Sequence, residues 1–201
     1  ERGPGGRAAL RRGFQPPFSE VYLYYGARRE VRFRAGQDAP AALARLAAQY
    51  FDGEGRLLPG AFARFEVFLA EAARLDPDLR CYEDTLGFIA QVRDAERRAK
   101  RLAEAFPRGV RSAALQDLLR IPLYDYQQEA ALFASRAGRC LIGDEMGLGK
   151  TMEAIASAEI MARHLGVERV LIVCPTSLKH QWEREIARVT DRPAHVIGGF
   201  R

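Results

Sequence analysis

The sequence predicts an α/β protein in which a mainly helical α+β module precedes the first part of a parallel-sheet domain. In the C-terminal half, short apolar runs alternate with helical patterns, an order typical of strand–helix–strand units. In the N-terminal half, two strand-like stretches precede three amphipathic helical patterns. We therefore divide the 201 residues into a flexible N-terminal segment (1–18), an accessory module (19–110) and the opening of the second domain (111–201).

The accessory module begins with a predicted β-hairpin. EVYLYY (20–25) and EVRFR (30–34) alternate in residue type and flank GARR, which is typical of two paired strands. Asp38 is the expected N-cap of the helix that follows. Three helices are expected, at about 38–50, from Phe62 to Ala72 and at about 82–106. We interpret the charge-rich half of the third helix (93–106) as a solvated face rather than a nucleic-acid contact.

In the second part of the chain, cap and stop residues mark where the predicted helices begin and end. Ser112 is a candidate cap for a short helix, and Gly138 is a stop signal for a later one. The helices are predicted at 112–119, 126–138, about 149–164 and from PTS through about 189. Three buried strands are predicted between or after them, at 139–143, 170–174 and 194–199.

Composition fits a packed, soluble protein. Hydrophobic residues make up 48% and charged residues 28%, which argues against wholesale disorder. The formal charge is +5, and it suits an anionic partner or reflects coding bias equally well. No apolar run is long enough to span a membrane, so we expect a cytoplasmic protein, nucleoid-associated if bacterial, with no membrane partner.

The three cysteines are few and widely spaced. Cys81, Cys140 and Cys174 show no C-x-x-C spacing, so neither a disulfide framework nor a zinc site is indicated. Cys140 and Cys174 lie inside apolar runs, and we expect both to be buried core residues.

A glycine-rich loop, GDEMGLGKT (143–151), links a predicted strand to a predicted helix. The first backbone N–H groups of such a helix lack partners and carry the positive end of its dipole, so they attract phosphate. Gly147 and Gly149 allow the loop to turn these groups inward, Lys150 offers a charge to the phosphates, and Thr151 offers a hydroxyl to Mg²⁺. The predicted nucleotide-lining residues within the loop are Met146, Gly147, Leu148, Gly149, Lys150, Thr151 and Met152. Asp144 stands where the general phosphate-loop pattern has its first glycine.

Three motifs in this order resemble the Swi/Snf-type branch of the superfamily-two helicase-like ATPases. They are LYDYQQEAA (123–131), DEMGLGKT (144–151) and VLIVCPTSLKHQWEREI (170–186). An aspartate at the place of Asp144 is normal in that branch. The resemblance covers about residues 120–190, and residues 1–110 show none.

The resemblance implies an ATP- and Mg²⁺-dependent motor with two RecA-like lobes that acts on double-stranded DNA, and this chain would hold the first part of one lobe. It implies that Lys150 is catalytic and that Gln127 reads the adenine edge, against the alternative of an exposed polar residue near a helix start. Thr176 and Ser177 would contact nucleic-acid phosphate, cap a helix, or do both, and Lys179 would contact phosphate or be solvated. Trp182 is expected to pack in the core.

Two parts of the implied motor do not occur in this sequence: an acidic D-E-x-H-type motif and the arginines of a second lobe. We therefore expect the 201 residues alone not to hydrolyse ATP. The accessory module could be regulatory or bind a protein partner. The alternatives to a DNA motor are a regulatory or protein-interaction fragment, and an RNA-directed or restriction-type motor of the same superfamily.

Overall fold

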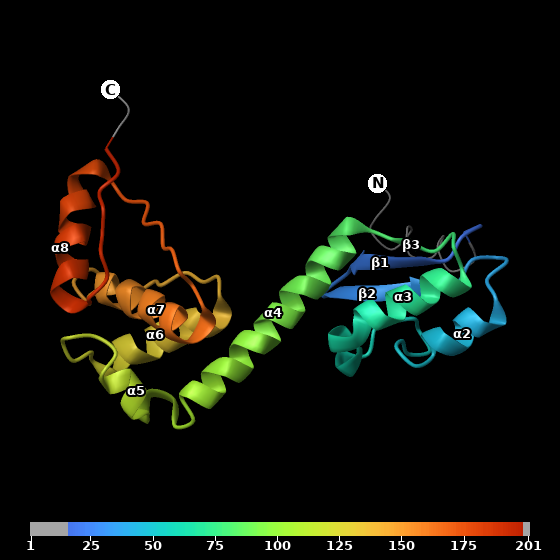
Figure 1. Cartoon of the computed structure of the whole chain (residues 1–201), viewed down its shortest axis with the longest axis horizontal. Helices are drawn as coiled ribbons and strands as arrows, with labels where there is room; N and C mark the ends of the chain where they lie inside the picture. The colour runs from blue at the N-terminus through green and yellow to red at the C-terminus, as the bar shows by residue number, and fades with distance from the viewer. Residues whose placement is uncertain (1–15, 199–201) are drawn as a thin grey trace. The chain divides into compact units, whose positions relative to one another are not determined.

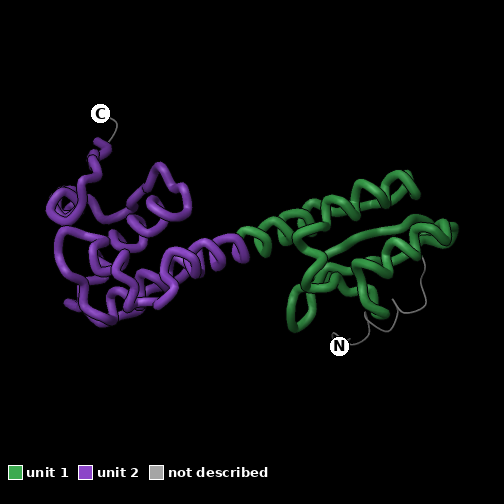
Figure 2. Tube along the Cα trace, turned by 60° about the horizontal axis from the view of Figure 1, so that its bottom comes forward, with its two compact units in different colours: residues 1–94 green, residues 95–201 purple. Residues whose placement is uncertain are grey.

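The computed structural model describes residues 16–198, so most of the predicted flexible segment (1–18) lies outside the described residues. The chain divides into two compact units, residues 1–94 and 95–201 (Figure 2). The division falls inside the long helix α4 (Glu83–Ala105). Each unit has a hydrophobic core of its own. The boundaries inferred from sequence for the accessory module stay a prediction.

Unit 1 contains the predicted hairpin. Strands β1 (Glu20–Tyr25) and β2 (Arg29–Arg34) pair in antiparallel fashion, and the short strand β3 (Arg80–Cys81) pairs with β1 in parallel, giving the order β2-β1-β3 (Figure 1). The alternation of side chains places Val21, Leu23 and Val31 in the core, as expected for strands with one covered face. The hairpin prediction is confirmed.

The helices of unit 1 complete that core. They are α2 (Ala41–Ala47), the 3-10 helix η1 (Pro59–Arg64), α3 (Phe65–Leu75) and the first half of α4. Phe68 is fully buried, and its ring lies 5.1 Å from the rings of Tyr50 and Phe51. The predicted cap at Asp38 is wrong, because the carbonyl of Pro40 accepts the first backbone bonds of α2.

Unit 2 is built from helices around a second core. It contains the second half of α4, η2 (Gly109–Arg111), α5 (Ala113–Gln116), α6 (Asp125–Ala137), α7 (Lys150–Leu165), η3 (Thr176–Leu178) and α8 (Lys179–Val189). Helices α6 and α7 pack along each other, with the small side chains of Ala131 and Ala156 fully buried. Gly138 ends α6 in the left-handed conformation, as predicted.

An ion-pair cluster, in which the buried carboxylate of Glu159 meets the exposed side chains of Arg163 and Arg192, fastens α7 to neighbouring turns. Arg163 Nε donates to Glu159 at 2.7 Å, and Arg192 Nε donates to the other carboxylate oxygen at 3.0 Å. Arg163 also donates to the carbonyl of Leu118, 2.9 Å away. Burial alone would raise the pKa of Glu159, but the bonds from the two arginines hold that pKa below its usual value.

The three predicted strands of unit 2 do not form within the described residues, so this prediction is wrong for the described structure. Residues 139–143, 170–174 and 194–198 carry no strand pairing, and several of their apolar side chains are exposed, with Leu141 at 90% and Val173 at 88%. An apolar run becomes a strand only when a neighbouring strand hydrogen-bonds to it. Strands that follow each other in sequence need not be neighbours in a doubly wound sheet, and these three segments do not pair with one another.

The exposure of these segments also corrects the expectation for the cysteines. Cys140 is exposed and Cys174 only half-buried, because each lies in a run that no second layer covers. Across residues 16–198, no helix is both long and apolar enough to cross a membrane.

Candidate nucleotide site

The glycine-rich loop leads directly into α7. Gly147 has φ +92° and Gly149 φ +83°, a left-handed region that side chains disfavour, so both glycines are needed for the turn that the loop makes. Gly149 is the N-cap of α7, and no side chain caps the helix. The first N–H groups of a sixteen-residue helix therefore face the loop, which is the arrangement that phosphate requires.

Gln127 fastens the loop to the start of α6. Its Nε2 donates to the carbonyl of Leu148 at 3.0 Å, and its Oε1 accepts from the backbone N–H of Tyr124 at 3.1 Å. Gln127 is buried, and a Cβ on Gly149 would lie 2.5 Å from Nε2. Gln127 is thus not the exposed polar residue of the alternative interpretation, and its amide sets the position of the loop.

Lys150 points back into the loop. Its ammonium group donates to the carbonyl of Asp144 at 2.7 Å and to that of Glu145 at 2.9 Å. The two acidic residues therefore meet the lysine through their backbone rather than their carboxylates. A lysine held by two carbonyls keeps its charge inside the loop, where it can exchange those carbonyls for phosphate oxygens.

Glu153 is a buried acid that the sequence interpretation missed. Its carboxylate oxygens have no hydrogen-bond partner, although it lies in the first turn of α7. Burial is the main cause that raises the pKa of Glu153 to about 7, the nearby Asp144 contributes to the rise, and Lys150 opposes it. Asp144 acts here through its proximity, because the two carboxyl groups do not meet the geometry of a hydrogen bond. Helical spacing from Ile160 could have revealed Glu153, since both lie on the buried face of α7.

Thr151 is the predicted ligand of Mg²⁺. It is half-buried in the first turn of α7 and supplies one hydroxyl. Within residues 16–198 no group of three or more His, Cys, Asp or Glu side chains could hold a metal on its own. The single hydroxyl of Thr151 suits Mg²⁺ bound with a nucleotide, because that ion takes few protein ligands and several phosphate oxygens.

The predicted nucleic-acid contacts lie at the start of α8. Thr176 and Ser177 are exposed in η3, and neither hydroxyl caps η3 or α8. Lys179 is half-buried and donates to the carbonyl of Ile197 at 3.0 Å, so it is not simply solvated. Trp182 packs against the core of unit 2, as predicted. No hydrogen bond found in the described part of the chain joins these residues to the glycine-rich loop.

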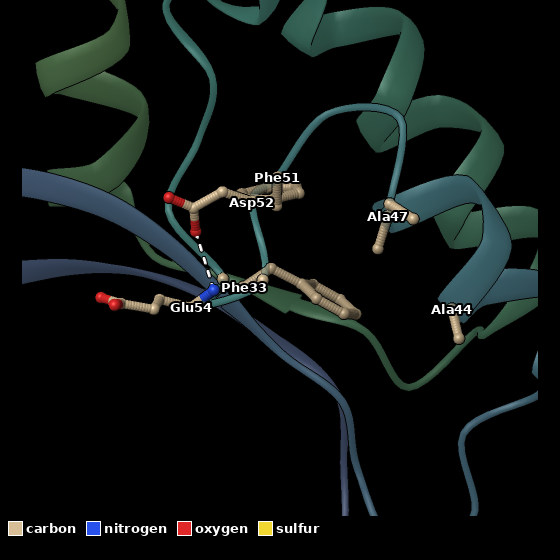
Figure 3. A pocket seen from close by; sticks show the side chains of 9 residues that line it. Phe33, Ala44, Ala47, Phe51, Asp52 and Glu54 are labelled. Atoms are coloured by element: carbon tan, nitrogen blue, oxygen red, sulfur yellow. Dashed lines mark hydrogen bonds between the residues drawn. The ribbon is translucent and has the colours of Figure 1, made fainter.

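A pocket of about 380 Å³ lies in unit 1, whereas the loop belongs to unit 2. Figure 3 shows the rings of Phe33 and Phe51 in its wall, with Asp52 accepting a bond from the backbone of Glu54 at 2.9 Å. Asp52 also accepts from the side chain of Arg56. Arg56 also pairs with the carboxylate of Glu54 at 3.0 Å, so neither carboxylate of the pocket is free to fix a small ligand.

The model of the SNF2-related domain matches residues 63–197, more than half of the chain. The chain belongs to the SNF2-related domain family. The match confirms the resemblance seen in the motifs, and it begins well before residue 120, where that resemblance started.

Several curated relatives match a shorter stretch of this SNF2-related chain. The mouse DNA annealing helicase and endonuclease ZRANB3 is 43% identical over 75 residues, which are 37% of this chain and 7% of the relative. The RNA polymerase-associated protein RapA of Yersinia pestis (strain Pestoides F) is 42% identical over 83 residues, 40% of this chain and 8% of the relative. A Caenorhabditis elegans homologue of the SWI/SNF-related matrix-associated actin-dependent regulator of chromatin subfamily A-like protein 1 is 42% identical over 66 residues, which are 32% of this chain and 9% of that protein. The chain thus spans less than a tenth of each, and no solved structure matches it significantly.

Proposed function

We propose that this chain is the nucleotide-binding part of an ATP-dependent motor that moves on duplex DNA or remodels protein on it. The observation that carries the proposal is the loop itself: left-handed Gly147 and Gly149, with Lys150 turned inward, in a chain of the SNF2-related family. The relatives are named as a DNA annealing helicase and as a protein associated with RNA polymerase, both compatible with a nucleic-acid partner.

The residues of the loop suit the binding of ATP. Lys150 would leave the carbonyls of Asp144 and Glu145 for phosphate oxygens, and the free N–H groups at the start of α7 would hold the same phosphates. Thr151 would hold Mg²⁺, which neutralises phosphate charge when it is bound. Gln127 has one amide hydrogen beyond its bond to Leu148, and this hydrogen would face the adenine edge.

The start of α8 suits a phosphate of the nucleic-acid backbone. The hydroxyls of Thr176 and Ser177 lie there and cap neither helix. Lys179 is the first residue after η3. Contacts of this kind fix the position of a protein on DNA without reading its sequence. We propose that the surrounding residues belong to a RecA-like lobe, whose sheet would cover the apolar runs at 139–143 and 170–174.

Phosphate release by the protein that carries these residues tests the proposal. We expect duplex DNA to stimulate ATP hydrolysis, duplex RNA not to do so, and the Lys150→Ala variant to lose the activity. Equal stimulation by RNA would favour the RNA-directed alternative, and activity without any nucleic-acid dependence would contradict the proposed motor. The isolated 201 residues should release no phosphate under the same conditions.

A further inference from the structure

The sheet of unit 1 has a second face, opposite the one that packs in the core. Side chains alternate between the two faces of a strand, and those of Val21, Leu23 and Val31 belong to the core. The side chains of the intervening residues therefore share the other face, here called the outer face. It carries Glu20, Tyr22 and Tyr24 of β1 with Glu30, Arg32 and Arg34 of β2.

The arginines of the outer face are stacked on aromatic rings. The guanidinium carbon of Arg32 lies 4.0 Å from the ring centroid of Tyr24. That of Arg34 lies 5.4 Å from the ring centroid of Tyr22, and Arg80 of the neighbouring strand β3 lies over a third ring at 3.6 Å. A guanidinium that covers a ring offers its own flat side to a further planar group, and nucleic-acid bases stack on such planes.

Two carboxylates hold these arginines in place. Arg32 Nε donates to Glu30 at 3.0 Å, and Arg34 Nε donates to Glu20 at 2.9 Å. In both pairs the second bond comes from Nη2, so Nη1 makes no hydrogen bond within residues 16–198. The two arginine side chains are only 24% and 25% exposed. The planar groups are thus fixed before a partner arrives, which lowers the entropy cost of binding.

The charges on the outer face indicate which partner fits it. The free Nη1 groups suit phosphates or carboxylates, but Glu20 and Glu30 beside them repel the dense charge of an acidic peptide or a DNA duplex. An unpaired base stacks on the guanidinium plane, and its amino group can donate to a carboxylate. The bases of a duplex are already stacked and paired with one another. Only a strand with unpaired bases therefore uses the planes, the free N–H groups and the acids together.

We propose that the outer face of unit 1 binds single-stranded DNA. The choice of DNA over RNA rests on the proposed function, whereas the stacking geometry is independent of the nucleotide site. This role differs from the backbone contact proposed at the start of α8, because the bases themselves are held. Every base has a π-face, so binding should depend little on the sequence of the strand.

The test replaces the flat groups without changing the charge. Fluorescence anisotropy measures the binding of a labelled single-stranded oligodeoxynucleotide, of the RNA strand with the same sequence and of the DNA duplex. The variant Arg32→Lys/Arg34→Lys keeps both charges and loses both planes. Loss of the stack on one base weakens binding by a factor of roughly 5 to 150. We expect a loss of at least that size for the single DNA strand, with the dependence on salt unchanged because no charge is removed.

A matched control is Arg45→Lys/Arg74→Lys, which makes the same change at exposed positions of α2 and α3. This control should bind the single strand as the wild type does. Thermal unfolding shows whether each variant is folded, and Arg32→Lys alone should lose a smaller factor than the double variant. It replaces the double variant if that protein does not fold.

The proposal is overturned if the wild type does not prefer the single strand over the duplex, or if the lysine variants of the outer face bind it equally well. Tighter binding of the RNA strand would overturn the choice of DNA. Calorimetric titration of the wild type with Mg·ATP separates this proposal from the proposed function. If ATP binds but the single strand is not preferred, the outer-face proposal fails alone. If the single strand binds as expected but ATP does not, the proposed nucleotide site fails alone.

Discussion

The amide of Gln127 donates to the carbonyl of Leu148, 3.0 Å away, and so joins the start of α6 to the glycine-rich loop. The loop is therefore shaped by a tertiary contact as well as by its own glycines. Because α6 and α7 also pack along each other, the glycine-rich loop is held by two helices that are packed together. A change that disturbs Gln127 should disturb the loop without touching Lys150.

Gly149→Ala is the substitution that strains this contact most directly. The new Cβ would lie 2.5 Å from Gln127 Nε2, and the residue would keep an unfavourable φ of +83°. We expect a loss of about 1–3 kcal/mol in the free energy of unfolding and a clear drop in ATP affinity. Urea unfolding and calorimetric titration measure the two effects.

Gly143→Ala is the control for that substitution. Gly143 lies in the same loop, but nothing stands within 4 Å of its Cβ position and its φ is not left-handed. It should behave as the wild type. If both alanine variants prove equally harmless, Gln127 does not constrain the loop.

Glu153→Gln should change how stability depends on pH. Burial, together with the nearby Asp144, raises the pKa of Glu153 to about 7 in the folded chain, above its ordinary value of 4.5. The folded state therefore binds the proton more tightly, so the stabilising effect is complete below pH 4.5 and is lost as the pH rises through 7. The loss is at most about 3 kcal/mol, and the glutamine variant, which cannot ionise, should not show it.

The difference between wild type and Glu153→Gln isolates this effect. The lowered pKa of His164, caused by burial and by Arg163, acts with the opposite sign, because folding then favours the neutral ring and stability grows as the pH rises through 6.5. That contribution is the same in both proteins and cancels. Urea unfolding at pH 5 and pH 8 measures the difference, and parallel pH profiles would show that Glu153 does not titrate in this range.

Glu159→Gln tests the ion-pair cluster that fastens α7. The substitution removes the charge that Arg163 and Arg192 share, and we expect a loss of about 1–3 kcal/mol in stability at pH 7. Because the pKa of Glu159 is lowered in the fold, the wild-type advantage should shrink as the pH falls below 4.5. Glu185→Gln, which breaks an exposed pair with Arg188, should cost less than about 1 kcal/mol. Thermal unfolding of the two variants side by side shows whether the burial of Glu159 makes its ion pairs contribute more to stability than the pair of Glu185.

The helices of this chain could be predicted from sequence because each carries its own signal. Helix α6 shows its period and its glycine stop, and Gly138 has the left-handed conformation that such a stop requires. The strands of unit 2 could not be predicted in the same way, since the run around Leu171 indicates burial but not the partner that would provide it. The cap of α2 was missed because Pro40 can start a helix as well as Asp38.

The part of the candidate site that lies within one short stretch of sequence could be predicted from residue types alone. Lys150, Gly147 and Gly149 lie together in one turn, as the pattern indicated. The structural role of Gln127 was not predictable, because its bond to Leu148 depends on how α6 approaches the loop. Glu153 was missed because a charged residue in a helix is normally assigned to the surface, although its helical spacing from Ile160 places it on the buried face of α7.

Binding of Mg·ATP by the wild-type chain and by Lys150→Ala tests most directly whether the glycine-rich loop is a nucleotide site. Lys100→Ala, in the charged part of α4, removes the same charge elsewhere and serves as the control. A lysine bonded to phosphate contributes a factor of about 10 to 100 in affinity. We expect calorimetry to show that loss for Lys150→Ala alone. Equal binding by all three proteins, or no binding by the wild type, would contradict the assignment of the loop as a phosphate site.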